Sequence, residues 1–303
     1  MVSVEIETKS PLHIGGTEAG LIDQPTFKRG GRPIIPGSTI KGATRSTLEE
    51  ALRRKIAEKA GKHGRDVELA REARHILEEA FEKLSKVMGQ DLATAFRQIA
   101  ETPQLEPYAY FPLVCDPLSG LHCNPPLSAR DVPEDRLETV RFFASAILMR
   151  RVSTDKLYCP ACSLFGGNGH PSPLVFKDAA PEGDVATALQ TRVSIDRLTG
   201  AAKQERLFTV EYLPPGQKFK GEVKKAEPHS IYTPQDLLYQ LEEYTKKILP
   251  CIKNLGKYKS VGYGEVDVKA DNNTNCEVDK VAEELVDKWL EDAKKDPDLT
   301  FLK

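Results

Sequence analysis

The amino-acid sequence predicts an α+β protein built on a ferredoxin-like core, and three observations lead to this fold class. Residues 2–8 alternate apolar and polar side chains, as a half-buried strand does. Apolar residues then recur at helical spacing in two places, after about residue 38 and after residue 234. Several strand-like stretches separate these helices, and another follows at 264–269. The order β-α-β-β-α-β is that of a ferredoxin-like sheet.

The first predicted helix follows a Pro-Gly turn and is expected to begin at about Ser38, a residue type that caps helices. Its apolar stripe is predicted to comprise Ile40, Ala43, Leu48, Ala51, Leu52 and Ile56. Gly61 and Gly64 interrupt the helical pattern, and a long helical stretch at about 67–100 follows them. This second stretch is expected to form an inserted helical hairpin.

The remaining elements are predicted from shorter patterns. Strands are expected at 174–178, 191–196, 206–212 and 218–223. A helix should run from Pro234 to about Ile252. Its inward side is expected to carry Leu237, Leu238, Leu241, Tyr244 and Ile248. An acidic amphipathic helix is predicted at 278–296 around Val281, Leu285 and Trp289.

Composition excludes several classes of protein. The 303 residues are 40% hydrophobic with a formal net charge of −2, so a large core is possible and no global basic field attracts nucleic acid. Charge is nevertheless segregated: residues 26–65 hold eleven Lys/Arg against three Glu. An apolar run long enough to span a membrane is absent, and MVSVEIETKS reads as a strand rather than a signal peptide. A cytoplasmic protein without a membrane partner is expected.

The six cysteines favour thiols or metal ligands in a reducing compartment over a disulfide framework. Four of them form two pairs whose spacing suits a structural, tetrahedral zinc site. These are Cys115, Cys123, Cys159 and Cys162. His122 is the obvious substitute ligand, and four unconnected buried thiols are the alternative. Cys251 and Cys276 are expected to be plain packing residues.

The N-terminal glycine-rich stretch points to an anion-binding site but to neither common nucleotide motif. It lacks the spacing of a Walker A loop and of a dinucleotide-binding loop. A Ser-capped helix start with Lys41 and Arg45 one turn apart could hold phosphates, although an ordinary capped helix is equally compatible. Asp23 either forms a turn with its own backbone or acts in catalysis. His13 either touches a phosphate or packs.

A second glycine-rich stretch, GKYKSVGYG, carries Lys257 and Lys259 among glycines and two tyrosines. Glycine allows a backbone to approach a phosphate, and tyrosine can stack on a base. The alternative is a tight turn between a helix and a strand.

Several motifs, in this order, together resemble one known family. They read SPLHIGG, GLIDQP, PIIPGSTIKGATR, CPACSLFGG, TRVSIDRLTGAAKQERLFTVEYLPPG and GYGEV. The pattern closely resembles the RAMP superfamily of CRISPR-associated proteins, and within its Cas-seven group it looks most like the backbone subunit of type III-A (Csm) effector complexes. The resemblance covers about half of the chain. It implies an RRM-like core with inserted subdomains, of which many copies stack along one guide RNA.

The resemblance also assigns roles to residues. It implies that Asp23 cleaves target RNA paired to the guide, and that a β-hairpin thumb at about 192–212 wedges between bases of the duplex. Guide RNA is expected to contact His13, Gly15, Gly16, Ser38, Lys41, Arg45, Arg192, Lys257, Lys259, Gly262, Tyr263 and Gly264. Carboxylates of ordinary pKa, about 4, are weak bases at neutral pH, so Asp23 is expected to hold Mg²⁺ or another divalent cation.

The predicted domains follow from this resemblance. They are a discontinuous core at 1–55 and 157–270, a helical insertion at 56–105, a Pro/Cys-rich insertion at 106–156 and the acidic helix at 278–296. The predicted function is that of a guide RNA-binding backbone subunit of a type III CRISPR complex, with Asp23-dependent endoribonuclease activity on complementary RNA. Its partners would be guide RNA, target RNA, other subunits and further copies of itself. The alternative is a non-catalytic, zinc-stabilised scaffold subunit of a related Cmr-type complex.

Overall fold

The computed structural model describes residues 1–16, 22–59, 159–167, 171–195, 198, 202–226 and 235–295. The chain divides into two compact units. The first contains residues 1–47, 174–225 and 242–277, and the second contains residues 48–173, 226–241 and 278–303. The predicted insertions lie outside the described residues, apart from 56–59, so their boundaries stay predictions.

The first unit contains an antiparallel sheet with the ferredoxin-like strand order. Its principal strands, in the order in which they pair, are β4 (Leu174–Phe176), β8 (Lys218–Lys225), β1 (Val2–Thr8) and β9 (Val266–Ala270). In chain order these are the second, third, first and fourth strands, as in a β-α-β-β-α-β fold. The predicted fold class is therefore confirmed for the core. Three two-residue strands accompany it: β2 (Lys28–Arg29), β3 (Arg32–Pro33) and β5 (Ala180–Pro181).

One face of this sheet is apolar because the strands alternate. Val2, Val4 and Ile6 of β1 are buried, as are Phe219 of β8 and Val268 of β9. The opposite face carries charged side chains that form ion pairs with one another. Among these pairs are Lys220–Glu5, Lys220–Glu182 and Lys224–Glu222. The alternation therefore directs the buried face toward the helices and leaves the other face polar.

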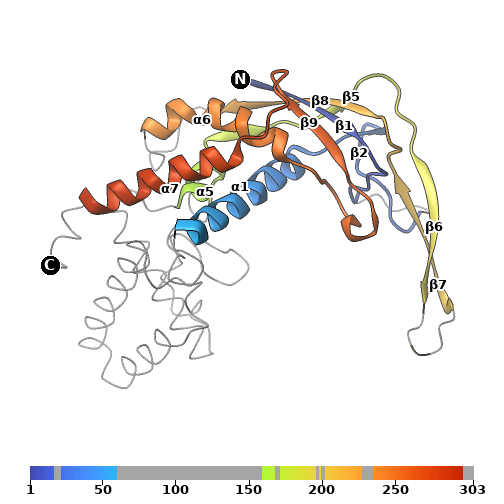
Figure 1. Cartoon of the computed structure of the whole chain (residues 1–303). Coiled ribbons are helices and arrows are strands. Elements are labelled where there is room, and N and C mark those ends of the chain that lie inside the picture. Colours follow the sequence, from blue (N-terminus) through green and yellow to red (C-terminus); the bar gives the residue numbers. More distant parts are fainter. Residues whose placement is uncertain are drawn as a thin grey trace, which may run out of the picture. The chain divides into compact units, whose positions relative to one another are not determined.

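Helix α1 (Gly37–Lys59), labelled in Figure 1, begins one residue earlier than predicted. Its cap comes from another segment. The Gly37 N–H donates to Oδ1 of Asp178 at 2.9 Å, so Asp178 rather than Ser38 satisfies the helix start. Residue 37 is glycine because a Cβ there would lie 2.1 Å from the Phe176 carbonyl oxygen. Local capping preference predicted the wrong residue because the actual acceptor lies far along the chain.

A long hairpin is inserted between β4 and β8 and extends away from the sheet (Figure 1). It comprises β6 (Ala188–Ile195) and β7 (Ala202–Tyr212), which pair antiparallel from Ala188 opposite Tyr212. The predicted hairpin is confirmed, but both strands are longer than the apolar alternation indicated. Backbone pairing extends them through residues 188–190 and 202–205, where apolar and polar side chains do not alternate regularly.

The C-terminal segment of the first unit, residues 242–277, contains the end of the second core helix and the last strand. Helix α6 (Gln235–Ile248) continues into a 3₁₀ turn, η2 (Leu249–Cys251), and a second 3₁₀ turn, η3 (Lys259–Val261), precedes β9. Tyr244 and Ile248 are buried, as predicted. Strand β9 begins two residues later than predicted, because Gly264 has φ +86° and cannot extend the strand.

Cys251 and Cys276 form a disulfide, with their Cα atoms 4.7 Å apart. The prediction that both are plain packing residues is therefore wrong, and for this pair so is the expectation that the cysteines are free thiols or metal ligands. The bond joins η2 to the segment that follows β9. Sequence spacing could not indicate it, because the fold brings together residues that are 25 positions apart.

In the second unit, the described elements are helical. They include α5 (Pro160–Phe165), α7 (Val278–Lys295), the part of α1 from Leu48 onward and the part of α6 up to Leu241. Leu48 and Leu52 of α1 are buried, as are Val281 and Leu285 of α7, in agreement with the predicted stripes. Of the helices that the structure describes, none has the length and apolarity needed to cross a membrane.

Candidate functional site

The candidate site is built around residues 22–28, which we call the Asp23 segment. On one side, this segment pairs with residues 12–16: Phe27 N donates to the Ile14 carbonyl at 2.7 Å. On the other side it pairs with the hairpin: Gln24 N donates to the Thr209 carbonyl at 3.0 Å, and Glu211 N donates to the Gln24 carbonyl at 2.9 Å. The Asp23 segment therefore lies between residues 12–16 and β7, and its backbone pairs with both.

Asp23 itself is exposed and is held by the hairpin. Its Oδ2 accepts a hydrogen bond from the Thr209 N–H at 2.7 Å. Because Thr209 belongs to β7, the orientation of this carboxylate depends on the hairpin rather than on the glycine-rich loop that precedes it. An exposed carboxylate in a fixed orientation can receive a cation or a hydroxyl group from a ligand.

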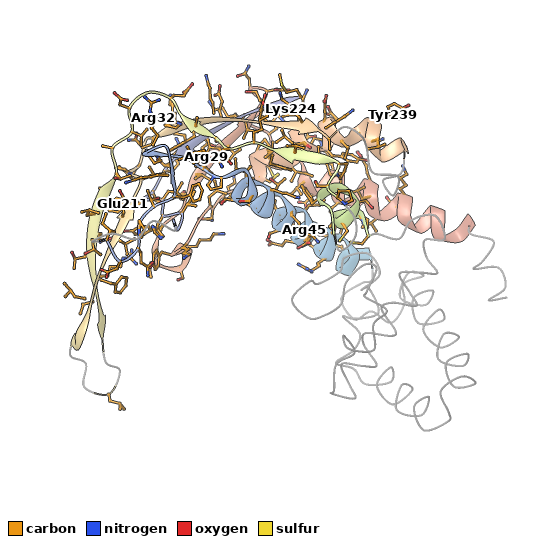
Figure 2. All side chains as sticks on the ribbon, turned by 180° about the vertical axis from the view of Figure 1, so that it is seen from behind. Arg29, Arg32, Arg45, Glu211, Lys224 and Tyr239 are labelled. Atoms are coloured by element: carbon orange, nitrogen blue, oxygen red, sulfur yellow. A yellow bond between two sulfur atoms is a disulfide. The ribbon has the colours of Figure 1, made fainter. Side chains whose placement is uncertain are left out.

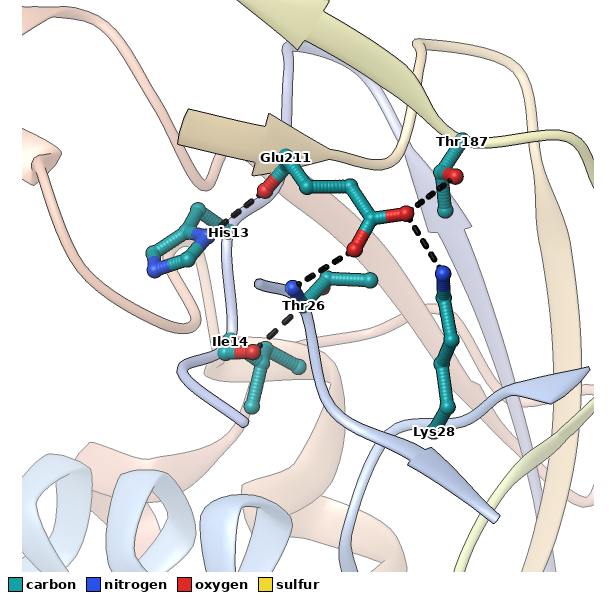
Figure 3. Close-up of polar contacts among 6 residues, drawn as sticks. All are labelled: His13, Ile14, Thr26, Lys28, Thr187 and Glu211. Atoms are coloured by element: carbon teal, nitrogen blue, oxygen red, sulfur yellow. Dashed lines mark hydrogen bonds and ion pairs between the residues drawn. The ribbon is translucent and has the colours of Figure 1, made fainter. Parts of the chain in front are cut away.

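A buried carboxylate fixes the base of the hairpin (Figure 3). The side chain of Glu211 is 3% exposed and accepts from Lys28 Nζ at 2.6 Å. It also accepts from Thr26 N at 3.0 Å and Thr187 Oγ1 at 2.5 Å. Burial raises the pKa of Glu211, but the hydrogen bonds from Lys28, Thr187 and Thr26 N outweigh it and leave the pKa below the ordinary value. Glu211 therefore joins the hairpin to the Asp23 segment as a carboxylate.

His13 is buried and its ring points toward the backbone of Glu211 instead of toward solvent. Its Nδ1 lies 2.7 Å from the Glu211 carbonyl oxygen, while its buried Nε2 has no hydrogen-bond partner among the described residues. Burial lowers the pKa of His13, with the Lys257 charge acting in the same direction. The neutral ring therefore packs between segments, and a direct contact of His13 with RNA stays a prediction.

The predicted glycines at 15 and 16 serve close backbone approach. A Cβ on Gly16 would meet the Thr26 carbonyl oxygen at 2.8 Å, and one on Gly15 would meet Lys257 Nζ at 3.0 Å. Close pairing of residues 12–16 with the Asp23 segment therefore requires a glycine at position 16, whereas at position 15 a side chain would meet only the flexible end of Lys257. The same contact places the ammonium group of Lys257 beside Gly15.

The second glycine-rich stretch, residues 256–264, folds back on residues 11–13. Lys257 N donates to the His13 carbonyl at 2.9 Å, and Gly264 N donates to the Pro11 carbonyl at 2.8 Å. A Cβ on Gly264 would lie 2.1 Å from the Leu255 carbonyl oxygen, so this glycine is structural. Gly262 has φ +83° with open space around it. Lys257 and Lys259 are exposed, which leaves both available for phosphate.

Arg192 and two tyrosines link the hairpin to this loop. The Arg192 guanidinium lies 4.6 Å from the Tyr258 ring centroid and 4.5 Å from that of Tyr263. Tyr263 is buried, and its ring also packs edge-on against Tyr212 at 5.8 Å. Its hydroxyl donates to Gln190 of β6. A base could stack on Tyr263 only after displacing Arg192, so base stacking there stays a prediction.

The predicted basic helix start lies on α1, where Figure 2 labels Arg45. Ser38 is exposed, and Lys41 has no ion pair with a residue that the structure describes. Burial lowers the pKa of Lys41, and the neighbouring Arg45 adds to this effect. Because Gly37 N is already bonded to Asp178, the helix start offers fewer free N–H groups than predicted. Anion binding here would depend on the Lys41 and Arg45 side chains.

Only half of the predicted zinc site lies within the described residues. Cys159 and Cys162 are buried at the start of α5, and the Cys162 N–H donates to Cys159 Sγ at 3.5 Å. Cys115 and Cys123, together with His122, lie outside them. The part of the chain that the structure describes contains no group of three or more metal-binding side chains.

Sequence reasoning missed Gln24, Thr209 and Glu211, and it considered Tyr258 only as one of two tyrosines that could stack on a base. A single acidic residue inside the apolar stretch TVEYL was the available signal for Glu211, because a charge on a strand is seldom buried without partners. Thr209 acts through its backbone, which sequence cannot reveal.

These features define a class: a ferredoxin-like core with an inserted hairpin that holds an exposed aspartate beside a basic, glycine-rich loop. The RAMP superfamily profile matches residues 5–267, and the chain belongs to that superfamily. Among known proteins, the chain is similar to the "CRISPR system Cms endoribonuclease Csm3" of Streptococcus thermophilus, with 43% identity over 63 residues. This similarity covers 19% of the chain and 29% of that relative.

Proposed function

We propose that this protein is a guide RNA-binding backbone subunit of a type III CRISPR complex that cleaves complementary RNA through Asp23. The observation that carries the proposal is the exposed Asp23 carboxylate, held by the Thr209 N–H at the base of the hairpin. Membership of the RAMP superfamily and the short similarity to a protein named as an endoribonuclease support it. Copies of the chain would assemble along the guide with other subunits.

The proposed cleavage needs the 2′-OH of the target strand to attack the adjacent phosphate in line, which forms a 2′,3′-cyclic phosphate and breaks the bond from phosphorus to the 5′-oxygen of the next nucleotide. The proton that the 2′-OH loses passes to water, and the 5′-oxygen takes up a proton from water and leaves as a 5′-OH. The hairpin would separate one nucleotide from the duplex and so allow this geometry. Asp23 would hold a divalent cation such as Mg²⁺, which stabilises the charge that develops on the phosphate. The Thr209 N–H donor keeps the carboxylate in one orientation, and this lowers the cost of ordering it on binding.

The guide would bind through local positive charge. Lys41, Arg45, Lys257 and Lys259 belong to the first unit and offer cations to a phosphate backbone. Lys41 gains most from an anion, because it is half-buried and lies beside a second cation. Such binding is tolerant of sequence and sensitive to salt, so base pairing between guide and target would supply specificity.

Reversing two charges tests the guide face. We expect Lys41→Glu with Arg45→Glu to weaken binding of single-stranded RNA about 100-fold at 0.1 M salt and to flatten the salt dependence. Fluorescence anisotropy with a labelled RNA across salt concentrations measures both quantities. Lys218→Glu with Lys269→Glu is the matched control, because it makes the same charge change on the polar face of the sheet. Equal affinities for the two double variants would contradict the proposed guide face.

A non-catalytic scaffold is the second candidate function. It is favoured by one observation: within the described residues, Asp23 belongs to no group of three or more side chains that could hold a metal. A scaffold would bind guide and target as tightly as the proposed enzyme but would leave the target intact.

A structural zinc ion at Cys115, Cys123, Cys159 and Cys162 is a separate proposal. The bond from Cys162 N to Cys159 Sγ fits it, because such N–H donors stabilise thiolate ligands. We expect elemental analysis of the purified protein to find about one zinc per chain. Cys159→Ser with Cys162→Ser should lose that zinc, whereas Cys251→Ser with Cys276→Ser should retain it. A full-length protein free of zinc would reject the site.

A further inference from the structure

Tyr258 has an uncommon backbone conformation at the centre of the candidate site. Its φ of 63° places it in the left-handed region, which bulky residues seldom adopt. Three glycines of the same loop, Gly256, Gly262 and Gly264, also have positive φ, but they carry no side chain to strain. A tyrosine in this conformation persists only where the surrounding contacts hold it.

Those contacts come from three other segments. The Tyr258 hydroxyl donates to Oε1 of Gln24, the residue that follows Asp23. The centroid of the Tyr258 ring lies 5.5 Å from the centroid of the His13 ring. The Arg192 guanidinium lies 4.6 Å from the same Tyr258 centroid. Tyr258 is therefore the one described side chain of the 256–264 loop that bonds to the Asp23 segment.

The neighbours of Tyr258 indicate what the hydrogen bond to Gln24 connects. Lys257 and Lys259 flank Tyr258 and are exposed, so an RNA strand bound by them would lie beside the backbone of Tyr258. Gln24, at the other end of the bond, is fixed to β7 by its own N–H and carbonyl groups, and Asp23 is fixed to the same strand. A single hydroxyl thus connects the loop proposed to hold the guide with the segment proposed to face the target.

We propose that Tyr258 is a positioning residue that holds Gln24, and with it Asp23, at a set distance from the guide-binding loop. The inference rests on the proposed function and extends it to a residue that touches neither the metal nor the scissile phosphate. In the assembled complex, the Tyr258 hydroxyl would keep the Asp23 carboxylate at a fixed position relative to the guide–target duplex. Its removal should slow cleavage and leave binding unchanged.

Tyr258→Phe tests the proposal because it removes the hydroxyl and keeps the ring between His13 and Arg192. In complex with guide RNA and partner subunits, we expect single-turnover cleavage at saturating target to slow about fivefold, the loss typical of one hydrogen bond. The dissociation constants for guide and target and the melting temperature should stay at wild-type values. Tyr239→Phe is the matched control, because Tyr239 is 80% exposed on α6.

A double-mutant cycle with Gln24→Leu separates positioning from a general loosening of the fold. Both single variants should slow cleavage similarly, and the double variant should be no slower than either, because they break the same bond. Additive losses, or wild-type cleavage by Tyr258→Phe, would overturn the inference. If the Asp23→Ala variant cleaves normally, it is the proposed function that fails. If Asp23→Ala alone loses cleavage, the proposed function stands and the role of Tyr258 is rejected.

Discussion

Replacement of Asp23 by alanine should abolish cleavage of complementary RNA while guide and target binding persist. The reason is the position of this carboxylate: it is exposed, and a backbone donor from β7 holds it in one orientation. Loss of a group that assists proton transfer or holds a catalytic cation typically costs about 100-fold or more in rate. The measurement is a single-turnover assay of the assembled complex with Mg²⁺ and a labelled target, in which wild type should produce regularly spaced cuts.

Two further variants make this result specific. Asp23→Asn keeps the size and an acceptor for the Thr209 N–H, but it removes the charge, so it should be as inactive as the alanine variant. Asp184→Ala removes an exposed aspartate elsewhere in the first unit and should cleave at the wild-type rate. Cleavage by Asp23→Ala at the wild-type rate, with the same spacing of cuts, would favour another active residue or a contaminating nuclease.

Replacement of Glu211 by alanine should destabilise the first unit by about 3–5 kcal/mol, because it leaves a partly buried cation without its partner. Lys28 Nζ, Thr26 N and Thr187 Oγ1 would all lose their acceptor at once. Thermal unfolding should register this as a decrease in melting temperature of about 10 °C. Glu5→Ala is the control: Glu5 pairs with Lys220 at the surface, and its loss should cost less than about 1 kcal/mol.

The pH dependence of stability provides an independent check on Glu211. Its pKa is lower in the folded protein than in the unfolded chain, so its stabilising effect is complete above the unfolded pKa, about 4.3, and is lost as pH falls through the folded value. The difference in unfolding free energy between wild type and Glu211→Gln should therefore be constant at neutral pH and shrink below about pH 4. A difference that grows in acid would contradict the carboxylate network of Figure 3.

Periodicity predicted the main elements well because they are long and amphipathic. The alternation of residues 2–8 matches β1 residue for residue, and the apolar spacing correctly predicted most of the described buried side chains of the stripes on α1, α6 and α7. Ala43 is only half-buried, and the side chains of Ile56, Leu237 and Trp289 lie outside the part that the structure describes. The predictions failed where the cause lies far along the chain. Asp178 caps α1, and Cys251 bonds Cys276, through contacts that only the folded sheet creates.

The candidate site divides in the same way. The two glycine-rich stretches could be predicted from sequence, because glycine patterns mark close backbone approach, while the functional roles of Asp23 and Arg192 follow from the family resemblance and stay predictions. The partners that orient them, Glu211 and Tyr258, act through hydrogen bonds across long separations and leave little trace in local sequence.

The sequence by itself determined the fold class, the superfamily and the identity of the exposed acid, because hydrophobic spacing and motif order are local properties. Only the tertiary structure decided that this acid is oriented by β7, that His13 is buried beneath the loop, and that Tyr258 joins that loop to the Asp23 segment. The physical reason is that strand pairing brings residues about 200 positions apart within hydrogen-bond distance, and no local preference encodes which donor will meet which acceptor.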